Sequence, residues 1–140
     1  MLSISKYQNK IISDMFVTGY LEKSENAVYS FRPLYDKVYF EIEHSIHEIS
    51  ISDEGKIKSK EVKEISPWFE VDEDDVFAVS SIYIQTLRTE EPVIIKKIEM
   101  QESLLSPLKI EVEVLGGRCE LKLDARNIFG FSFYFSNYES

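Results

Sequence analysis

The clearest structural signal in the chain runs from Leu108 to Asp124 and reads LKIEVEVLGGRCELKLD. Apolar and charged residues alternate on both sides of Gly116-Gly117, a pair that can adopt the positive φ angles of a two-residue hairpin turn. This turn predicts a register in which every inward residue meets another inward residue. The predicted pairs are Leu115 with Arg118, Val114 with Cys119, Val112 with Leu121, Ile110 with Leu123 and, on the outer face, Glu111 with Lys122.

A third strand is predicted directly after this hairpin. Residues 129–135 read FGFSFYF, with phenylalanine at every second position. A period of two places these rings on one side of a strand, so the segment predicts a β-meander with one aromatic face made of Phe129, Phe131, Phe133 and Phe135. We expect buried side chains at Val112, Val114, Cys119, Leu121, Phe131 and Phe133, and exposed ones at Glu111, Glu113, Glu120 and Lys122.

Length and composition fit a single folded domain over residues 1–140, with 44% hydrophobic and 13% aromatic residues. The only cysteine, Cys119, excludes an internal disulfide, fits a reducing compartment and is expected to be a small buried residue. The first residues lack a secretion signal, and no apolar run is long enough to span a bilayer. These features predict a cytoplasmic protein.

The acidic balance of the chain limits its partners. The formal net charge is −9 and the sequence pI is near 4.8. Nucleic acids and anionic membranes repel such a surface, so neither is expected as a partner. A basic protein remains a suitable partner.

The first part of the chain predicts one helix and two strands. Lys6–Phe16 has apolar residues at helical spacing and is expected to form a short amphipathic helix. Phe16–Glu22 is rich in β-formers and predicts a strand. A second strand is expected over Ala27–Phe31, ended by Pro33, which cannot donate to a β-ladder.

The middle of the chain predicts further strands. Lys37–Ile51 alternates throughout except for a phase slip at residues 44–47, which indicates a bulge or bend. Asp53-Glu54-Gly55 predicts a hairpin turn, and the lysine-rich return over Lys56–Ile65 is typical of an exposed or edge strand.

Val76–Leu87 is the most hydrophobic run. Its β-branched residues favour a central strand, although Asp75 could instead cap a helix there. Val93–Met100 predicts another strand. Together the segments predict a mainly β fold, an antiparallel β-sandwich or curved open sheet with one or two short helices.

No constellation in the sequence predicts catalysis, a metal site or a cofactor. His44 and His47 are three residues apart, so on one strand their imidazoles point to opposite faces, and we expect two partly exposed polar residues. Asp72–Asp75 lacks the glycine and the closing glutamate of a calcium loop. Nothing near Cys119 favours a reactive thiolate.

Charge is unevenly distributed along the chain. Residues 61–91 contain nine acids and two bases, which is −7 of the net −9, and the densest part lies beside the only tryptophan. An aromatic anchor rimmed by charge is a common interface design, and a field of one sign speeds encounter with an oppositely charged partner. The alternative is a solvated loop whose aromatic residues are buried in the core. The candidate partner-binding residues are Trp68, Phe69, Glu70, Asp72, Glu73, Asp74 and Asp75.

In size, charge and β-content the whole chain resembles the immunity proteins of bacterial toxin–immunity systems, including those of contact-dependent inhibition. This resemblance implies a non-catalytic protein that neutralises a basic, nuclease-like toxin domain by binding it. Another hypothesis is a β-barrel or sandwich that binds a small molecule or lipid in a cavity lined by the aromatic face. An enzyme of unrecognised type ranks last, and the oligomeric state stays open.

Overall fold

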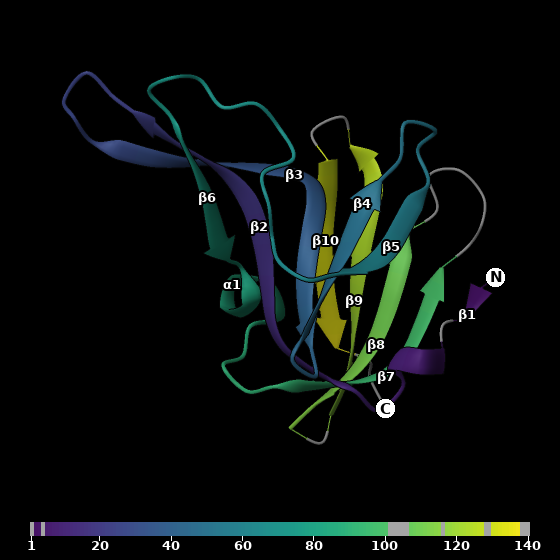
Figure 1. Cartoon of the computed structure of the whole chain (residues 1–140). Coiled ribbons are helices and arrows are strands. Elements are labelled where there is room, and N and C mark those ends of the chain that lie inside the picture. Colours follow the sequence, from purple (N-terminus) through teal and green to yellow (C-terminus); the bar gives the residue numbers. More distant parts are fainter. Residues whose placement is uncertain (1, 4, 101–106, 116, 128–129, 138–140) are drawn as a thin grey trace.

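A closed barrel of six strands forms the body of the molecule (Figure 1). The computed structural model describes residues 2–3, 5–100, 107–115, 117–127 and 130–137. Besides a 3₁₀ turn at Ser5–Tyr7, the elements are β1 (Leu2–Ser3), β2 (Ile11–Lys23), β3 (Tyr29–Ile42), β4 (Ser45–Ile51), β5 (Ile57–Val62), β6 (Val76–Ser81), α1 (Tyr83–Leu87), β7 (Val93–Met100), β8 (Leu108–Val114), β9 (Gly117–Asn127) and β10 (Gly130–Asn137). Within the described residues the ring runs β2–β3–β10–β9–β8–β7 and returns to β2.

The mainly β character was predicted correctly, but the predicted sandwich or curved open sheet is wrong. Ring closure depends on β2 and β3, which are 13 and 14 residues long and so contact several neighbours. Ile11 and Ile12 of β2 pair with β7. On the other side of the ring, Tyr35 of β3 pairs in parallel with Gly130 of β10. A strand's own sequence does not reveal both of its neighbours, so alternation cannot distinguish a closed sheet from an open one.

Gly130 makes this parallel contact possible. Its φ angle is 106°, a conformation that residues with a side chain rarely adopt. A Cβ atom at this position would also overlap the backbone of Tyr35. Close approach of β10 to β3 therefore requires glycine here.

The predicted hairpin of β8 and β9 is confirmed, but its turn is displaced. Val114 pairs with Gly117, so the connection is Leu115-Gly116 rather than Gly116-Gly117, and Gly116 lies outside the described residues. The partner of each β8 residue moves by two positions, which preserves the faces because side chains alternate with a period of two. The register also depends on packing against β7 and β10, which the hairpin pattern does not contain. The predicted buried residues Val112, Cys119, Leu121 and Phe131 are buried, while Val114 and Phe133 are partly buried.

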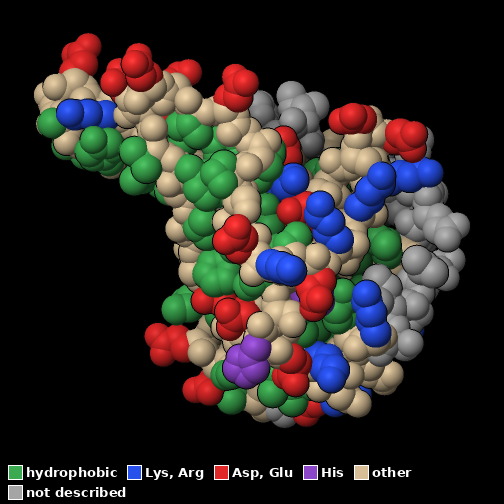
Figure 2. All heavy atoms as spheres, viewed as in Figure 1, with side chains coloured by type: hydrophobic (Ala, Val, Ile, Leu, Met, Phe, Trp, Pro, Cys, Tyr) green, Lys and Arg blue, Asp and Glu red, His purple; other side chains and the backbone are tan. Residues whose placement is uncertain are grey.

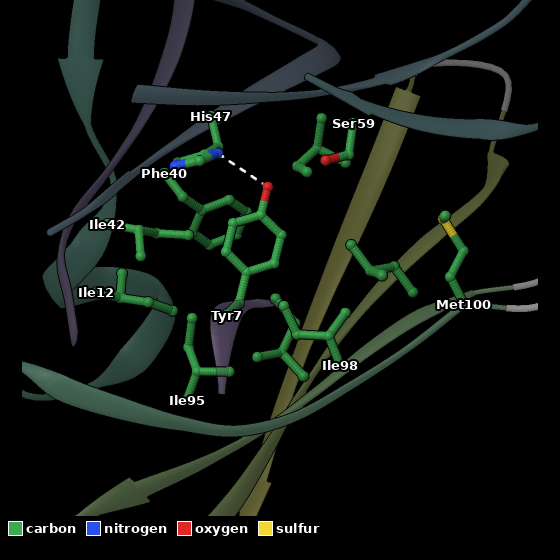
Figure 3. A pocket seen from close by; sticks show the side chains of 12 residues that line it. Tyr7, Ile12, Phe40, Ile42, His47, Ser59, Ile95, Ile98 and Met100 are labelled. Carbon is green, nitrogen blue, oxygen red and sulfur yellow. Dashed lines mark hydrogen bonds between the residues drawn. The ribbon is translucent and has the colours of Figure 1, made fainter. Parts of the chain in front are cut away.

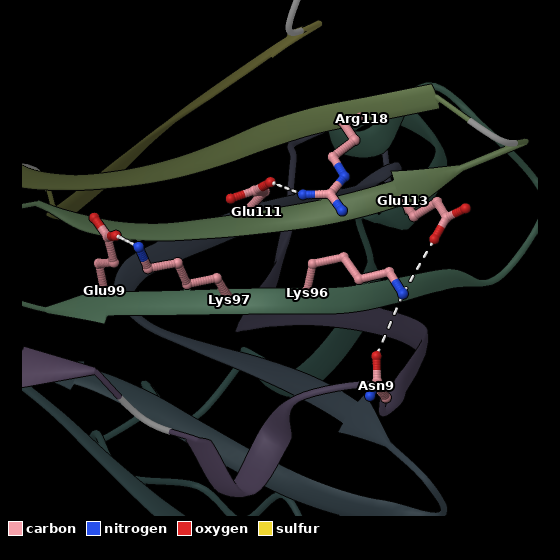
Figure 4. A network of polar contacts seen from close by, with 7 residues as sticks. All are labelled: Asn9, Lys96, Lys97, Glu99, Glu111, Glu113 and Arg118. Atoms are coloured by element: carbon pink, nitrogen blue, oxygen red, sulfur yellow. Dashed lines mark hydrogen bonds and ion pairs between the residues drawn. The ribbon is translucent and has the colours of Figure 1, made fainter.

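The outer face of β7–β9 is more covered than expected, because its charges pair with one another (Figure 4). In the register observed, Glu111 faces Glu120 rather than Lys122. Arg118 donates from Nη1 to the carboxylate of Glu111 at 2.6 Å, which offsets the repulsion of that pair. Further ion pairs join Lys96 to Glu113 at 3.2 Å and Lys97 to Glu99 at 2.5 Å. The predicted exposed residues Glu111, Glu113, Glu120 and Lys122 are therefore partly buried.

Additional strands extend the barrel at two places. The ends of β2 and β3 continue past the ring as a two-stranded ribbon, residues 20–32, which we call the arm; it projects from the body in Figure 1. Strand β6 pairs with residues 16–21 of β2, next to the arm. On β3, residues 37–42 pair with β4, and β5 pairs with β4. Among the described strands, β5 and β6 lie at the two ends of the sheet.

The helix predicted over Lys6–Phe16 is wrong, because β2 begins at Ile11 and includes the predicted strand Phe16–Glu22. A register irregularity between Ile12 and Asp14 turns both Ile12 and Met15 into the core. A bulge of this kind places inward residues three apart, which imitates the spacing of a helix. Ser5–Tyr7 alone is helical in this part of the described chain, as a single 3₁₀ turn.

Pro33 does not end a strand as predicted, since β3 continues through it. Pro33 pairs with Gly19 of β2, where a Cβ atom would overlap the carbonyl group of Arg32. On the other side of β3, pairing with β10 is recorded only at Tyr35 and pairing with β4 only from Lys37 onward. A residue without an N–H is tolerated where only one neighbouring strand is present.

The bulge predicted at residues 44–47 is a turn. Glu43 and His44 both have positive φ angles, 49° and 70°, and connect β3 to β4. Two successive positive φ angles are typical of a two-residue hairpin turn. Such a turn is usually predicted from Asn-Gly, whereas Glu-His gives no such signal in the sequence. The next turn, at Asp53-Glu54-Gly55, and the exposed strand after it are confirmed, with Gly55 at φ 82°.

The central strand predicted over Val76–Leu87 is also wrong. The segment divides into β6, at one end of the sheet, and the short helix α1. The capping position of α1 is Ile82 rather than Asp75. No residue of β6 is buried, whereas Tyr83 and Leu87 of α1 are. A run without charges indicates low polarity, but it does not indicate where the strand lies in the sheet.

The core fills the barrel and the space under β4 and β5. Its fully buried side chains include Ile12, Met15, Phe40, Ile95 and Leu121. Val93–Met100 forms β7 as predicted. In the part of the chain that the structure describes, no helix is long and apolar enough to cross a membrane.

Candidate functional site

The connection from β5 to β6, residues 63–75, contains the predicted site; we call it the acidic loop. Trp68 fastens it to the barrel, because its indole Nε1 donates to Oγ1 of Thr18 on β2 at 2.7 Å. Thr18 is fully buried, so this hydrogen bond satisfies a hydroxyl group that water does not reach. The ammonium group of Lys37 lies 5.2 Å from the centre of the Trp68 ring, a cation–π contact.

Lys37 is itself held by the strands below. Its ammonium group lies 3.2 Å from Oε1 of Glu48, whose side chain is almost buried. Glu48 also accepts a hydrogen bond from Tyr39, and burial together with this neighbouring carboxylate raises the pKa of Tyr39. The Lys37 ammonium group that contacts the Trp68 ring is therefore held in place by its pairing with Glu48.

Phe69 joins the loop to β6. Its ring lies 4.9 Å from that of Trp68, 5.7 Å from that of Phe77 and 6.5 Å from that of Tyr20. These four side chains form an aromatic cluster on the outer face of β2 and β6. Trp68 and Phe69 are half-buried, which is intermediate between an exposed anchor and a core residue.

The predicted acidic residues follow directly and point to solvent. Glu70, Asp72, Glu73 and Asp74 are exposed, and Asp75 is half-buried. Among the ion pairs of the described residues, none involves these five carboxylates. Partial burial, then the carboxylates of Asp72, Glu22 and Asp74, raise the pKa of Asp75 above its usual 3.8. The acidic loop therefore carries a negative field to which Glu22 at the base of the arm contributes, although Glu22 also pairs with Arg32 at 3.5 Å.

Exposed apolar side chains lie on the arm and directly after these acids. Val28 and Tyr29 on the arm and Val76 at the start of β6 are each more than half exposed. In Figure 2, acidic side chains line one edge of the projecting arm and hydrophobic side chains line the other. We call residues 20–32 together with residues 70–76 the arm–loop surface. It combines unpaired carboxylates with apolar area that water contacts.

The two histidines lie in different environments. His44 is exposed in the turn between β3 and β4, whereas His47 is buried, which corrects the prediction that both are partly exposed. The Nδ1 atom of His47 is hydrogen-bonded to the hydroxyl of Tyr7 at 3.0 Å, and burial lowers its pKa. No group of three or more potential metal ligands occurs among the described residues. The absence of a metal or cofactor stays a prediction.

Cys119 is buried on the inward side of β9, as predicted. Its Sγ donates to Oδ1 of Asn137 at 3.1 Å. Burial raises the pKa of the thiol, which disfavours the reactive thiolate at neutral pH.

The described part of the barrel interior is filled. A cavity of about 20 Å³, enough for about one water molecule, lies behind Tyr7 and is walled by aliphatic residues such as Ile95, Ile98 and Met100 (Figure 3). Phe131, Phe133 and Phe135 do not line this cavity but pack with the core, and Phe129 lies outside the described residues. The cavity inside the barrel is therefore not a ligand site lined by the aromatic face, but Phe135 lines an open hollow of about 620 Å³, and Phe133 and Phe135 line another of about 270 Å³.

Two features of the site were not anticipated from the sequence. One is the arm, because nothing in its residues shows that the ribbon continues past the barrel. The other is the position of β6 at the end of the sheet. The sequence did contain a signal for the position of β6. Val76–Ser81 has no charged residue and directly follows five acids within residues 70–75.

No family model matches the chain, and no curated protein and no solved structure is significantly similar to it. Function must therefore be inferred from the geometry and charge of the described residues.

Proposed function

We propose that this protein acts without catalysis, by binding a basic protein partner through the arm–loop surface. The observation that carries the proposal is that five carboxylates of the acidic loop, none in an ion pair among the described residues, directly precede the exposed Val76, next to an arm that exposes Val28 and Tyr29. An interface needs apolar area for affinity, and charges of one sign at its rim for speed and selectivity. Both occur together on this surface.

The carboxylates have a kinetic role in this proposal. They lie on the acidic loop, and Glu22 at the base of the arm, which pairs with Arg32 at 3.5 Å, adds to the field at Asp75. A basic partner that diffuses near this end is attracted and oriented before contact. Added salt screens this attraction, so association should slow while dissociation changes less.

Trp68 and Phe69 have a double role. Their contacts with Thr18, Phe77 and Tyr20 position the acidic loop on the barrel. The exposed parts of both rings would then contact the partner as apolar anchors. Trp68→Ala should raise the dissociation rate if the ring is an anchor, and lower the melting temperature if its main role is to hold the loop.

A toxin domain is the partner that we propose. Immunity proteins resemble this chain in size, acidity and β-content, and they neutralise basic toxins by binding them. The candidate to test first is the product of the adjacent upstream gene, by co-purification with the tagged protein. A complex of the two proteins would provide the material for kinetic measurements.

The decisive experiment reverses charge at the proposed surface. Asp72→Lys, Asp74→Lys and Asp75→Lys together should slow association by about tenfold or more, because local steering is lost. The control is Asp53→Lys, Glu54→Lys and Glu90→Lys, three exposed acids outside the arm–loop surface whose reversal changes the net charge equally. Association kinetics of both variants would be measured at low and at raised salt. Equal effects of the two triple variants, or an unchanged affinity in the first, would exclude this surface as the binding site.

A further inference from the structure

Strand β6 presents an unpaired edge. Among the described strands it pairs with β2 alone, over residues 76–81. Figure 1 shows β6 at the margin of the sheet, with α1 at one end and the arm near the other. The edge that faces away from β2 is therefore available to another strand.

This edge lacks the protection that proteins usually give to such strands. Exposed edges are commonly guarded by lysine, proline, a bulge or an inward-pointing charge. β6 reads VFAVSS, contains none of these residues and pairs with β2 in an unbroken register. Val76 and Val79 are among the exposed large hydrophobic residues of the described chain. In a monomer such a strand invites uncontrolled pairing, so its retention points to a partner.

Backbone alternation shows which groups are free. The N–H of Ile82 donates to the carbonyl of Met15, which marks residues 82 and 15 as a hydrogen-bonded position of the antiparallel ladder. Such positions alternate along the strands. Ala78 and Ser80 therefore point their backbone groups at β2, while Phe77 and Val79 point theirs at the open edge. An incoming strand would find two N–H and two carbonyl groups in register.

The surroundings indicate the chemistry of that strand. The first residue of β6 follows Asp74 and Asp75, and Glu22 of the neighbouring arm acts on the same field. Lysine or arginine residues in a segment paired with β6 would meet these carboxylates at one end. A second copy of this chain fits less well, because each copy has a net charge of −9 and brings its own acidic loop.

We propose that an extended, basic segment of the partner adds to β6 as a new β-strand. This inference rests on the proposed function and names its binding mode: backbone hydrogen bonds to Phe77 and Val79, apolar contact with Val76 and Val79, and ion pairs at the acidic end. Strand addition uses main-chain groups for affinity and side chains for selectivity.

Amide hydrogen exchange of the free protein tests the open edge first. The amides of Ala78 and Ser80 should exchange about tenfold or more slowly than those of Phe77 and Val79, because only the former bond to β2. Slow exchange of Phe77 and Val79 that weakens on dilution would mean that a second copy covers the edge. Slow exchange at every concentration would mean that the edge is closed within the chain. Either result would overturn the proposal.

The probe is a synthetic peptide of about seven residues with alternating lysine and valine, a length that covers a typical strand. A peptide of equal charge with a central proline serves as its control. The alternating peptide should slow exchange at Phe77 and Val79 in the protein, and the proline peptide should not. Absence of binding, or binding that leaves these two amides unprotected, would refute strand addition.

Variants at one position separate backbone from side-chain effects. Val79→Pro removes an outward N–H and should weaken peptide binding by about tenfold or more. Val79→Thr keeps the N–H and should change binding by less than about threefold. Val79→Lys keeps the backbone N–H but adds a charge that repels the basic peptide, so it should also weaken binding. This variant tests the edge even where the proline variant does not fold. Equal binding by all three variants would exclude this edge.

The two proposals can fail separately. If charge reversal at Asp72, Asp74 and Asp75 slows partner association but Val79→Pro has no effect on the complex, the arm–loop surface binds without strand addition. If Val79→Pro weakens the complex and charge reversal does not, the edge is used but the acidic loop does not steer. If neither the charge reversal nor Val79→Pro affects the complex, both proposals are rejected.

Discussion

The two strands at the ends of the sheet have opposite kinds of sequence. β5 reads IKSKEV; its Lys58, Lys60 and Glu61 are exposed, and Ile57 is buried in the core. β6 reads VFAVSS, without a charge, and none of its residues is buried. Both strands pair on one side only among the described residues. One end of the sheet is thus protected by lysines and anchored by an isoleucine, while the other has neither.

The difference shows that one sheet can treat its two edges differently. Lysines on β5 oppose pairing with another chain, because bringing such a strand close would desolvate and crowd the charges. β6 lacks this protection and lies where the acidic loop and the arm meet. We propose that β6, as the strand end of the sheet without charged residues, serves as a selective binding surface.

The largest expected effect distinguishes the two sides of β6. Ala78→Pro should lower the free energy of unfolding by about 3 kcal/mol, because it removes a ladder hydrogen bond to β2. Val79→Pro should cost less than about 1 kcal/mol, since the lost N–H faces the open edge. Urea unfolding followed by Trp68 fluorescence measures both. Equal losses would mean that β6 is not an edge with the alternation described.

A somewhat smaller effect tests the anchoring of the other end. Ile57→Ala should cost about 2 kcal/mol, because it leaves a cavity where β5 meets the core. Val76→Ala, at an exposed position of β6, should cost less than about 0.5 kcal/mol. The same urea unfolding measurement compares the two variants. A reversed order would show that β6, not β5, is held by its side chains.

Removing the lysines of β5 should make that edge resemble β6. Lys58→Val with Lys60→Val should increase self-association by about tenfold at about 0.5 M salt, where the net charge is screened. Lys10→Val with Lys109→Val removes the same charge from exposed positions away from the strands at the ends of the sheet and should leave self-association unchanged. Sedimentation velocity over a range of concentrations measures the difference. If both double variants self-associate equally, net charge rather than protection of the β5 edge prevents self-association.

The smallest expected effects are changes of stability with pH, and they have opposite signs at the β5 and β6 ends of the sheet. Burial lowers the pKa of His47, which pairs with Glu61 of β5, below 6.5 in the folded state. Its contribution to stability is complete above pH 6.5 and falls as the pH drops toward the folded-state pKa, because the unfolded chain then binds the proton more readily. His47→Gln should flatten this dependence, and His44→Gln should not. Thermal unfolding between pH 7 and pH 5 measures it.

At the β6 end, the pKa of Asp75 is raised, so the ionised carboxylate is disfavoured by folding. Stability from this group is present below its unfolded pKa of 3.8 and is lost as the pH rises through the folded pKa. Asp75→Asn should therefore slightly raise the melting temperature at pH 7 and have less effect at pH 3. A lower melting temperature at pH 7 would mean that the carboxylate makes a favourable contact there.

Much of the local structure is predictable because side-chain alternation reports on burial. The faces of the β8–β9 hairpin, the burial of Cys119, the turn at Gly55 and the lysine-rich edge strand all follow from a period of two and from turn chemistry. Predictions failed where a bulge imitated another period, as between Ile12 and Asp14, or where a turn lacked its usual residues, as at Glu43-His44. The acidic segment was found from sequence because charge density is visible without a fold.

What the sequence determined by itself is the mainly β character, the acidic field beside Trp68 and the uncharged nature of Val76–Ser81. Only the tertiary structure decided that the sheet closes into a barrel, that Trp68 fastens the loop to Thr18, and that β6 lies at an edge rather than in the centre. The reason is physical. Alternation and polarity describe the two faces of a strand, whereas its two edges are set by which other strands pair with it, and those partners lie far away in the chain.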